Sequence, residues 1–353
     1  MKIKFDQRWT NLGIQFLAII AALGFTTLIL LLAGAPPFKA YQQLLYGIFG
    51  SVDNISNVLV SWIPLLITSA GLLVTFAAGL WNIGIEGQII IGAVATTGVL
   101  RMLQNTAVPA GIIIFLGIIA GMFGGALWAS LAGALKTFGG VNEIFGGLGM
   151  NFIANTIVLW LIYGPWRRPG VASLSGTVAF PDRLSLPTLP GVQFSIWSLI
   201  LGVLSIVVVY VLLRGTYIGL RLKAIGKNFR AAYILGIPTW QYLMLSFFVC
   251  GLFAGLTGSL QVVGVYHRLL PTISSGYGFL GLLVAMLINF QAIWVAPIAL
   301  FYAALNIGSI QLPIVLRLDS NLSGVLQGIL VLFVLLTEGV RQRFIRRPQD
   351  KTL

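Results

Sequence analysis

Long apolar runs dominate this sequence, and charged residues almost never interrupt them. Only 8% of the 353 residues are charged and 58% are hydrophobic, whereas a soluble domain carries about 25% charged residues. The mean hydropathy is +0.99. Such a surface cannot mostly face water, and no polar segment is long enough to fold separately. We therefore expect an all-α fold, a polytopic membrane helix bundle that forms one domain over residues 1–353.

A transmembrane helix needs about 20 mostly apolar residues, and the sequence offers about ten candidates. They are 12–33, 56–80, 86–103, 109–135, 147–164, 196–213, 242–263, 276–290, 292–311 and 322–339. We favour an uncleaved first span, because the apolar part of a signal peptide runs only about 7–15 residues. Cleavage near Ala35 is the alternative. Ten spans would permit two inverted five-helix halves, as in many transporters, although the sequence shows no convincing internal repeat.

The placement of the positive charges indicates the orientation. The formal net charge is +13, but the basic residues gather between the apolar runs, so we expect no nucleic-acid partner. With a cytoplasmic N-terminus, fourteen of the 21 Lys and Arg residues lie inside, as the positive-inside rule requires. We predict a multi-pass protein of the cytoplasmic (inner) membrane. Both termini would be cytoplasmic, and segment 165–195 would be an extracytoplasmic loop.

Residues suited to catalysis or ion coupling are scarce. A single cysteine, Cys250, and a single histidine, His267, leave no disulfide framework and no metal cluster, so we expect neither an enzyme nor a metal site. Of the acidic residues, only Glu86 and Glu143 lie near apolar segments, which is little for proton or sodium coupling. A stand-alone ion-coupled transporter that uses one of them is the alternative, and export is a third possibility.

The sequence contains no GxxxxGK[ST] phosphate loop, which many ATPases use to bind ATP. We therefore expect no cofactor in this chain, and ATP with Mg would bind a separate ATPase subunit. Such a subunit needs a docking segment on the cytoplasmic face.

The most basic inner loop, 219–238, is the candidate docking segment. It contains a predicted helix over 229–235. Asn228 suits the N-cap, where a side chain accepts from a free backbone N–H. Gly236 suits the left-handed position after the helix, and Pro238 follows as a stop. Two turns are unstable alone in water, so this helix would pack on a partner or on the bundle. An ordinary interfacial linker helix is the alternative.

Five stretches resemble a known family. The segment Arg230 to Gly236 resembles the EAA-x-x-x-G loop of ABC importer permeases, with arginine in place of glutamate. Three further stretches resemble, in the same order, the branched-chain-type permeases for simple sugars and nucleosides: NIGIEGQ (82–88), NEIFGGLGMNFIAN (142–155) and GLRLKAIGKNFRAA (219–232). The segment YGPWRRPG (163–170) is similar to the larger of two paired permeases in nucleoside uptake systems.

This resemblance implies a permease subunit that moves a nucleoside or simple sugar by alternating access. The implied partners are a cytoplasmic ATPase subunit, a second permease in a heterodimer or homodimer, an extracytoplasmic solute-binding protein and the lipid bilayer. The ATPase would dock against Lys227, Asn228, Arg230, Ala231, Ala232 and Gly236.

The stretch NIGIEGQ allows two interpretations. As an inner turn, it would use Gly84 and Gly87 for unusual backbone angles, with Glu86 hydrated near the start of the next span. As a helix break inside the bundle, its freed backbone groups would line a cavity or be satisfied by protein. The span count favours the turn.

Other polar residues in apolar spans are Asn151, Asn155 and Asn289. Hydrogen bonding between helices explains each of them individually. Together, the candidate pathway residues for an uncharged solute are Asn82, Glu86, Gln88, Asn151, Asn155 and Asn289.

Overall fold

The computed structural model describes residues 21, 23–32, 34–170, 176–188, 191–288 and 292–316, together with the single residues 325, 328, 329, 332 and 336. Within these residues the regular elements are helices, and the sheet-type pairing is one isolated bridge between Thr188 and Ser195. Contacts divide the chain into two compact units, Leu59–Ala303 and the combination of Met1–Val58 with Ala304–Leu353.

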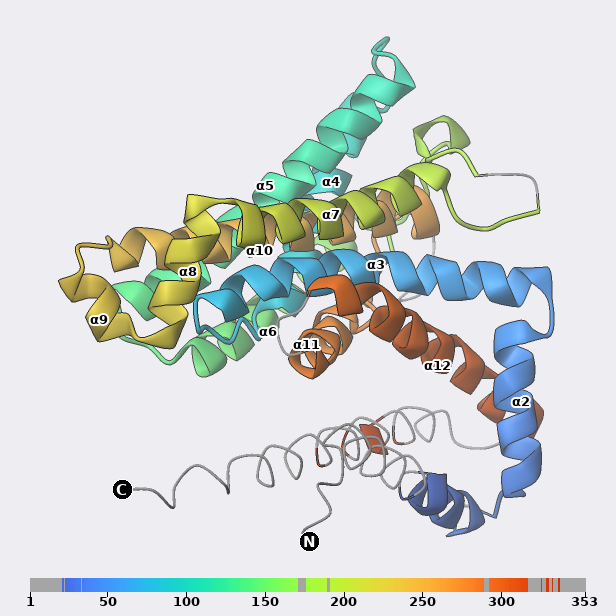
Figure 1. Ribbon diagram of the computed structural model, residues 1–353. Coiled ribbons are helices and arrows are strands. Elements are labelled where there is room, and N and C mark those ends of the chain that lie inside the picture. The colour runs from blue at the N-terminus through green and yellow to red at the C-terminus, as the bar shows by residue number, and fades with distance from the viewer. Residues whose placement is uncertain are drawn as a thin grey trace, which may run out of the picture. The chain divides into compact units, whose positions relative to one another are not determined.

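Figure 1 shows the helices of the described residues. They are α2 (Pro37–Phe49), α3 (Val52–Ala77), α4 (Ile85–Leu103), α5 (Ala110–Thr137), α6 (Glu143–Tyr163), η1 (Asp182–Leu184), α7 (Ile196–Gly215), α8 (Tyr217–Lys227), α9 (Phe229–Ile234), α10 (Thr239–Leu260), η2 (Gln261–Tyr266), α11 (Tyr277–Leu287), η3 (Ala292–Trp294) and α12 (Val295–Leu316).

Seven helical segments in this part of the chain are long and apolar enough to cross a membrane: α3, α4, α5, α6, α7, α10 with η2, and η3 with α12. Each coincides with a predicted span. The predicted span 276–290 is wrong as a complete crossing, because α11 has only 11 residues and would be about 17 Å long. Most of segment 322–339 and half of 12–33 lie outside the described residues, so the count of ten is not confirmed.

The sequence prediction missed α2, which follows the tandem Pro36-Pro37. Proline at the first helical position is well suited to start a helix, because its missing N–H would be unpaired there anyway, and Pro37 occupies that position. The helical segment Leu23–Leu32 and α2 meet at a bend of 113°. Gly34, with a φ of +73°, lies at the bend.

Close glycine contacts join α4, α5 and α10 in the larger unit. A Cβ added to Gly125 would lie 2.6–2.7 Å from backbone atoms of Gly255, and one added to Gly92 would lie 2.9 Å from the Gly255 carbonyl oxygen. Real side chains do not fit at such distances, so the three backbones approach as closely as glycine permits. Thr96 on α4 donates to Ser259 on α10 at 2.8 Å. Small residues thus let these helices pack closely, as is common between transmembrane helices.

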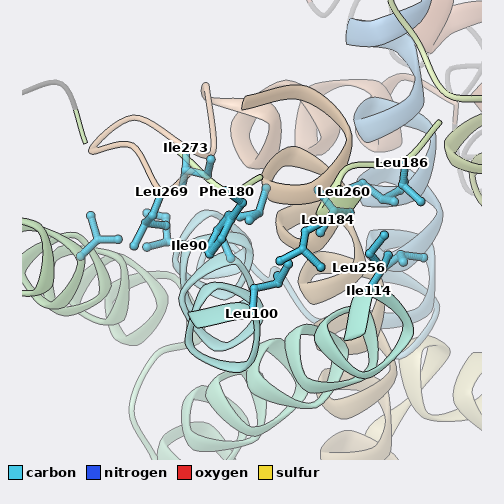
Figure 2. Packing of buried hydrophobic residues seen from close by; sticks show 14 of the residues in the cluster. Ile90, Leu100, Ile114, Phe180, Leu184, Leu186, Leu256, Leu260, Leu269 and Ile273 are labelled. Atoms are coloured by element: carbon cyan, nitrogen blue, oxygen red, sulfur yellow. The ribbon is translucent and has the colours of Figure 1, made fainter. Parts of the chain in front are cut away.

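The segment 176–188 packs against the C-terminal end of α10 and the turn that follows. The backbone N–H groups of Thr177, Phe180 and Leu186 donate to the carbonyls of Leu269, His267 and Val263 at 2.8–2.9 Å. Figure 2 shows Phe180, Leu184 and Leu186 with residues of α4, α5 and α10 in one buried apolar cluster. Within the predicted loop 165–195, segment 176–188 is therefore a layer packed on the bundle.

The smaller unit joins α2 to the C-terminal part of α12. A Cβ on Gly47 would lie 3.0 Å from the Cα of Gly308, so these helices also meet at glycines. Leu30, Ala40 and Leu312 form its small buried cluster.

Candidate functional site

The NIGIEGQ stretch forms a helix break whose polar side chains bind one another. α3 ends at Ala77 and α4 begins at Ile85. Asn82 donates to the Oε1 atom of Gln88 at 3.1 Å, and Gln88 donates back to the Oδ1 atom of Asn82 at 2.9 Å. Asn82 also donates to the Sγ atom of Cys250 on α10 at 3.2 Å. Asn82 and Gln88 are buried, and the hydrogen bonds between their amides hold the connection between α3 and α4 in shape.

Asn151 on α6 holds the other side of this break. Its side chain accepts from the backbone N–H of Gly87 at 2.8 Å and donates to the carbonyl of Ile83 at 3.0 Å. The approach is close, because a Cβ on Gly147 would lie 2.6 Å from the backbone nitrogen of Gly84. Asn151 thus satisfies backbone groups that the interrupted helix frees, as apolar surroundings require.

Glu86 is buried, and its carboxylate lies at the beginning of α11. Its Oε2 atom accepts from the backbone N–H of Gly278 at 2.8 Å, and its Oε1 atom accepts from that of Gly276 at 3.2 Å. The first N–H groups of a helix lack intrahelical partners and carry a partial positive charge. The carboxylate of one helix therefore caps another helix almost 200 residues later in the chain.

This arrangement corrects the favoured interpretation of Glu86 as a hydrated residue near a turn. Its exposed fraction is 6%, and its hydrogen bonds run to α11 and not to the start of α4. The NIGIEGQ stretch lies inside the bundle, as the alternative expects, but it still joins two segments long enough to span, α3 and α4, as the turn interpretation expects. Gly84 has a φ of −68° and Gly87 lies within α4, so neither supplies the unusual backbone angle that was predicted. The N-terminus of α11 comes this close because residue 278 has no side chain: a Cβ there would lie 2.8 Å from the Cα of Glu86.

The remaining sequence candidates do not join this network. Asn155 lies on an exposed face of α6. Asn289 lies outside the described residues. Glu143, the second acid near an apolar segment, pairs with Lys136 at 2.7 Å.

The predicted docking helix is present as α9, with the expected end signals. Asn228 accepts from the backbone N–H of Ala231 at 3.0 Å. Gly236 has a φ of +78°, and the N–H groups of Gly236 and Ile237 donate back to Tyr233 and Ala232. This double hydrogen bond is the Schellman motif. The predicted helix boundaries are confirmed.

Several contacts fix α8, the helix that precedes α9, to the bundle. Gly226 in α8 lies against the end of α3, where a Cβ would meet Gly79 at 3.0 Å. Arg221 donates to the hydroxyl of Tyr242 on α10 at 2.6 Å and stacks over the ring of Tyr217. Lys223 donates to the carbonyl of Leu213 at 2.6 Å. These contacts make α8 a firm support.

α9 buries a small side chain against the bundle and exposes its large side chains. Ala232 is buried, whereas Tyr233, Ile234 and Leu235 are 69%, 82% and 79% exposed. Lys227, Asn228, Arg230, Ala231 and Gly236 are also exposed. An exposed apolar cluster with basic residues beside it is typical of a protein-binding surface.

Apolar spans, a helix break closed by the chain's own side chains and an exposed two-turn helix define a membrane transport subunit, not an enzyme. The chain belongs to the family described as "branched-chain amino acid transport system / permease component", whose model matches residues 54–335. It is the permease subunit of an ATP-binding-cassette importer of the cell membrane, with ATP hydrolysis on a separate subunit.

Several characterised relatives align with most of the chain. The glucose ABC transporter permease protein TsgB13 of Haloferax volcanii is 28% identical, over 97% of this chain and 93% of its own length. The guanosine ABC transporter permease protein NupP of Bacillus subtilis is 27% identical, over 95% and 96%. The nucleoside ABC transporter permease protein NupB of Lactococcus lactis subsp. cremoris is 25% identical, over 84% and 83%.

The residues that sequence reasoning missed are the partners of Glu86. Gly276 and Gly278 belong to the stretch SSGYG (274–278) that precedes an apolar run. Closely spaced glycines at a helix start are a signal for close backbone approach. Nothing local to that stretch, however, identifies the carboxylate it binds.

Proposed function

We propose that this permease imports a nucleoside or a simple sugar, moved by alternating access while a separate ATPase subunit binds and hydrolyses ATP with Mg. The solute class is supported by the relatives, which act on glucose, guanosine and nucleosides and align with most of this chain.

The observation that carries the coupling role is the exposure of α9 on its firm support. Ile234 and Leu235 are largely exposed, although a helix of six residues gains little stability from its own hydrogen bonds. A cleft on the ATPase would cover these side chains and transmit its movement through α8 to the α3–α4 break. Arg230 would face the ATPase where related permeases carry glutamate.

The coupling role is tested by a double substitution, Ile234→Ser with Leu235→Ser, in the complete complex reconstituted in liposomes. We expect at least tenfold less ATPase retained on the purified permease and a matching loss of ATP-driven guanosine or glucose uptake. The control is Met102→Ser, because Met102 is 79% exposed at the far end of α4. Full ATPase retention in the double variant would refute docking through α9.

The rest of the assembly follows from the same proposal. We infer one permease domain, built of two inverted halves, with both termini in the cytoplasm. A second permease would complete the path, and an extracytoplasmic binding protein would deliver the solute to the face that carries segment 165–195. Purification of the intact complex, followed by mass spectrometry of its subunits, tests this composition.

Of the residues predicted to contact the solute, Asn155 is now the main candidate. Asn82, Gln88, Asn151 and Glu86 are engaged within the chain, so we assign them to the shape of the helix break. Asn155 is exposed, and the adjacent face of α6 is hollowed by about 400 Å³ between Phe152, Thr156 and Trp160. We propose that this face borders the path shared with the second permease.

The ion-coupled alternative receives no support from the two acids near apolar segments. Glu86 is capped by backbone N–H groups, and Glu143 is paired with Lys136. Uptake by the complex driven by an ion gradient without ATP would revive that alternative.

A further inference from the structure

A small, mostly apolar cavity with a few polar lining residues lies between α3, the beginning of α7 and the end of α10 with η2. Its volume is about 20 Å³. The polar part of its lining is Ser195, Ser198, Thr257 and Gln261, and the rest is apolar. None of the described residues that line it is ionisable, so the cavity suits a neutral ligand.

Two side chains that line this cavity are buried without a hydrogen-bond partner. Gln261 is 2% exposed and Ser195 is 1% exposed. Neither amide atom of Gln261 is hydrogen-bonded, and nor is the Oγ atom of Ser195. The Tyr277 hydroxyl group approaches the Gln261 side chain without completing a hydrogen bond to either amide atom. An unpaired buried polar group is costly, which indicates that another group satisfies these atoms.

The backbone around the cavity is irregular on two sides. Pro64 lies inside α3 and lacks the N–H that an α-helix would pair with the carbonyl of Val60. Opposite it, residues 261–266 form a π-helical turn at the end of α10, a feature found frequently at functional sites. Ser195 occupies the N-cap of α7, yet its side chain does not cap that helix. The proline in α3, the π-helical turn and the N-cap serine all border one cavity.

We propose that this cavity binds one neutral hydroxyl group, held between the amide of Gln261 and the hydroxyl of Ser195. A cavity of this volume accommodates one water-sized group, since about 10–15 Å³ suffices. A hydroxyl group both donates and accepts, so it can satisfy the Oε1 and Nε2 atoms of Gln261 together. The group is either an ordered water or a hydroxyl of the transported solute. The proposal holds whichever solute is imported.

The sign of a stability change tests the proposal. Gln261→Met keeps the length of the side chain and removes its polar atoms. If the cavity is filled as proposed, the substitution deprives the bound group of its partners, and we expect the Tm of the purified full-length permease to fall by a few degrees. If the cavity is dry, the substitution removes an unpaired amide, the Tm rises, and the proposal is refuted.

A matched control and a coupled variant separate this effect from packing. Thr97→Val removes another buried, unpartnered hydroxyl, at a residue that does not line the cavity, and we expect an unchanged or higher Tm. Ser195→Ala with Gln261→Met should lower the Tm by less than the sum of the single changes, because one bound group joins two residues that make no direct hydrogen bond. Additive effects would overturn the proposal, as would an equal fall in Thr97→Val.

The two sources of the hydroxyl are distinguished in the same experiments. A density peak within hydrogen-bonding distance of Gln261 in a high-resolution map without solute identifies water. If instead guanosine or glucose raises the Tm of the wild type but not of Gln261→Met, the solute supplies the group. An empty cavity in maps with and without solute refutes the site.

Discussion

At the scale of single residues, Glu86 shows how a carboxylate is tolerated inside a membrane bundle. A buried charge without partners is very costly, but Glu86 meets the partly positive N-terminus of α11 and two backbone donors. In transporters with broken helices, such N-termini are aimed at anionic groups of the solute. Here the protein supplies the anionic group itself, which leaves this helix end occupied.

The cap on α11 can be tested by substitution of Glu86. We expect Glu86→Ala to lower the free energy of unfolding by about 1–3 kcal/mol for each N–H group left unpaired. Glu86→Gln keeps one acceptor atom and should cost less. Glu143→Ala is the control, because a partly exposed ion pair contributes only about 0–1 kcal/mol. Thermal unfolding in detergent measures all three, and equal effects of Glu86→Ala and Glu143→Ala would contradict the cap.

Gly278 provides a second test of the same contact from the side of α11. A Cβ at this residue would lie 2.8 Å from both the Cα and the backbone nitrogen of Glu86, so we expect Gly278→Ala to lower the Tm and to separate the helices. Gly149→Ala is the matched control: Gly149 lies within α6 with no atom within 4 Å of an added Cβ. There alanine should be neutral or stabilise by up to about 1 kcal/mol. Equal shifts in the two variants would show that the close approach is unimportant.

At the scale of elements, α9 depends on its two caps more than a long helix would. Asn228→Ala removes the bond to Ala231, which costs about 1 kcal/mol at an N-cap, and Gly236→Ala forces alanine into the left-handed region at about 1–2 kcal/mol. If the helical form is the one that docks, we expect ATP-driven uptake to fall by about fivefold in Asn228→Ala. Asn228→Ser keeps a capping oxygen and should restore uptake. Normal uptake in Asn228→Ala would show that the cap has no role in coupling.

The contrast between α9 and α11 shows what the sequence could predict. The signals of α9 lie within eleven residues, from Asn228 to Pro238, because capping bonds are local. The partners of Glu86 lie 190 and 192 residues away, and a single sequence contains no local trace of that contact. The length of an apolar run was also a misleading signal. The run 276–290 was predicted to be a span, whereas the helix it forms, α11, ends at Leu287. The π-helical turn at Gln261 had no signal that distinguished it from the α-helix before it.

At the scale of the whole molecule, two segments of the larger unit lie at the two ends of α10. Segment 219–238, with α9, immediately precedes α10, whereas segment 176–188 is hydrogen-bonded to residues just beyond Leu260. In Figure 1, α8 and α9 lie at one end of α10 and the 176–188 segment lies at the other. α10 with η2 has 28 residues, about 42 Å at 1.5 Å per residue, which exceeds the roughly 30 Å apolar thickness of a bilayer. We therefore expect the two segments to lie on opposite sides of the membrane.

This opposition allows the orientation to be measured with single cysteines. The native Cys250 is buried, so the wild type should remain unlabelled by a membrane-impermeant maleimide and serves as background. Ile234 in α9 is 82% exposed and Val178 in the packed layer is 46% exposed. Since the positive charges place α9 inside, we expect Val178→Cys to react in intact cells and Ile234→Cys only after the membrane is opened. The reverse pattern would show that the permease has the opposite orientation in the membrane, with α9 out of reach of a cytoplasmic ATPase. Labelling of both in intact cells would show that α10 does not cross the bilayer.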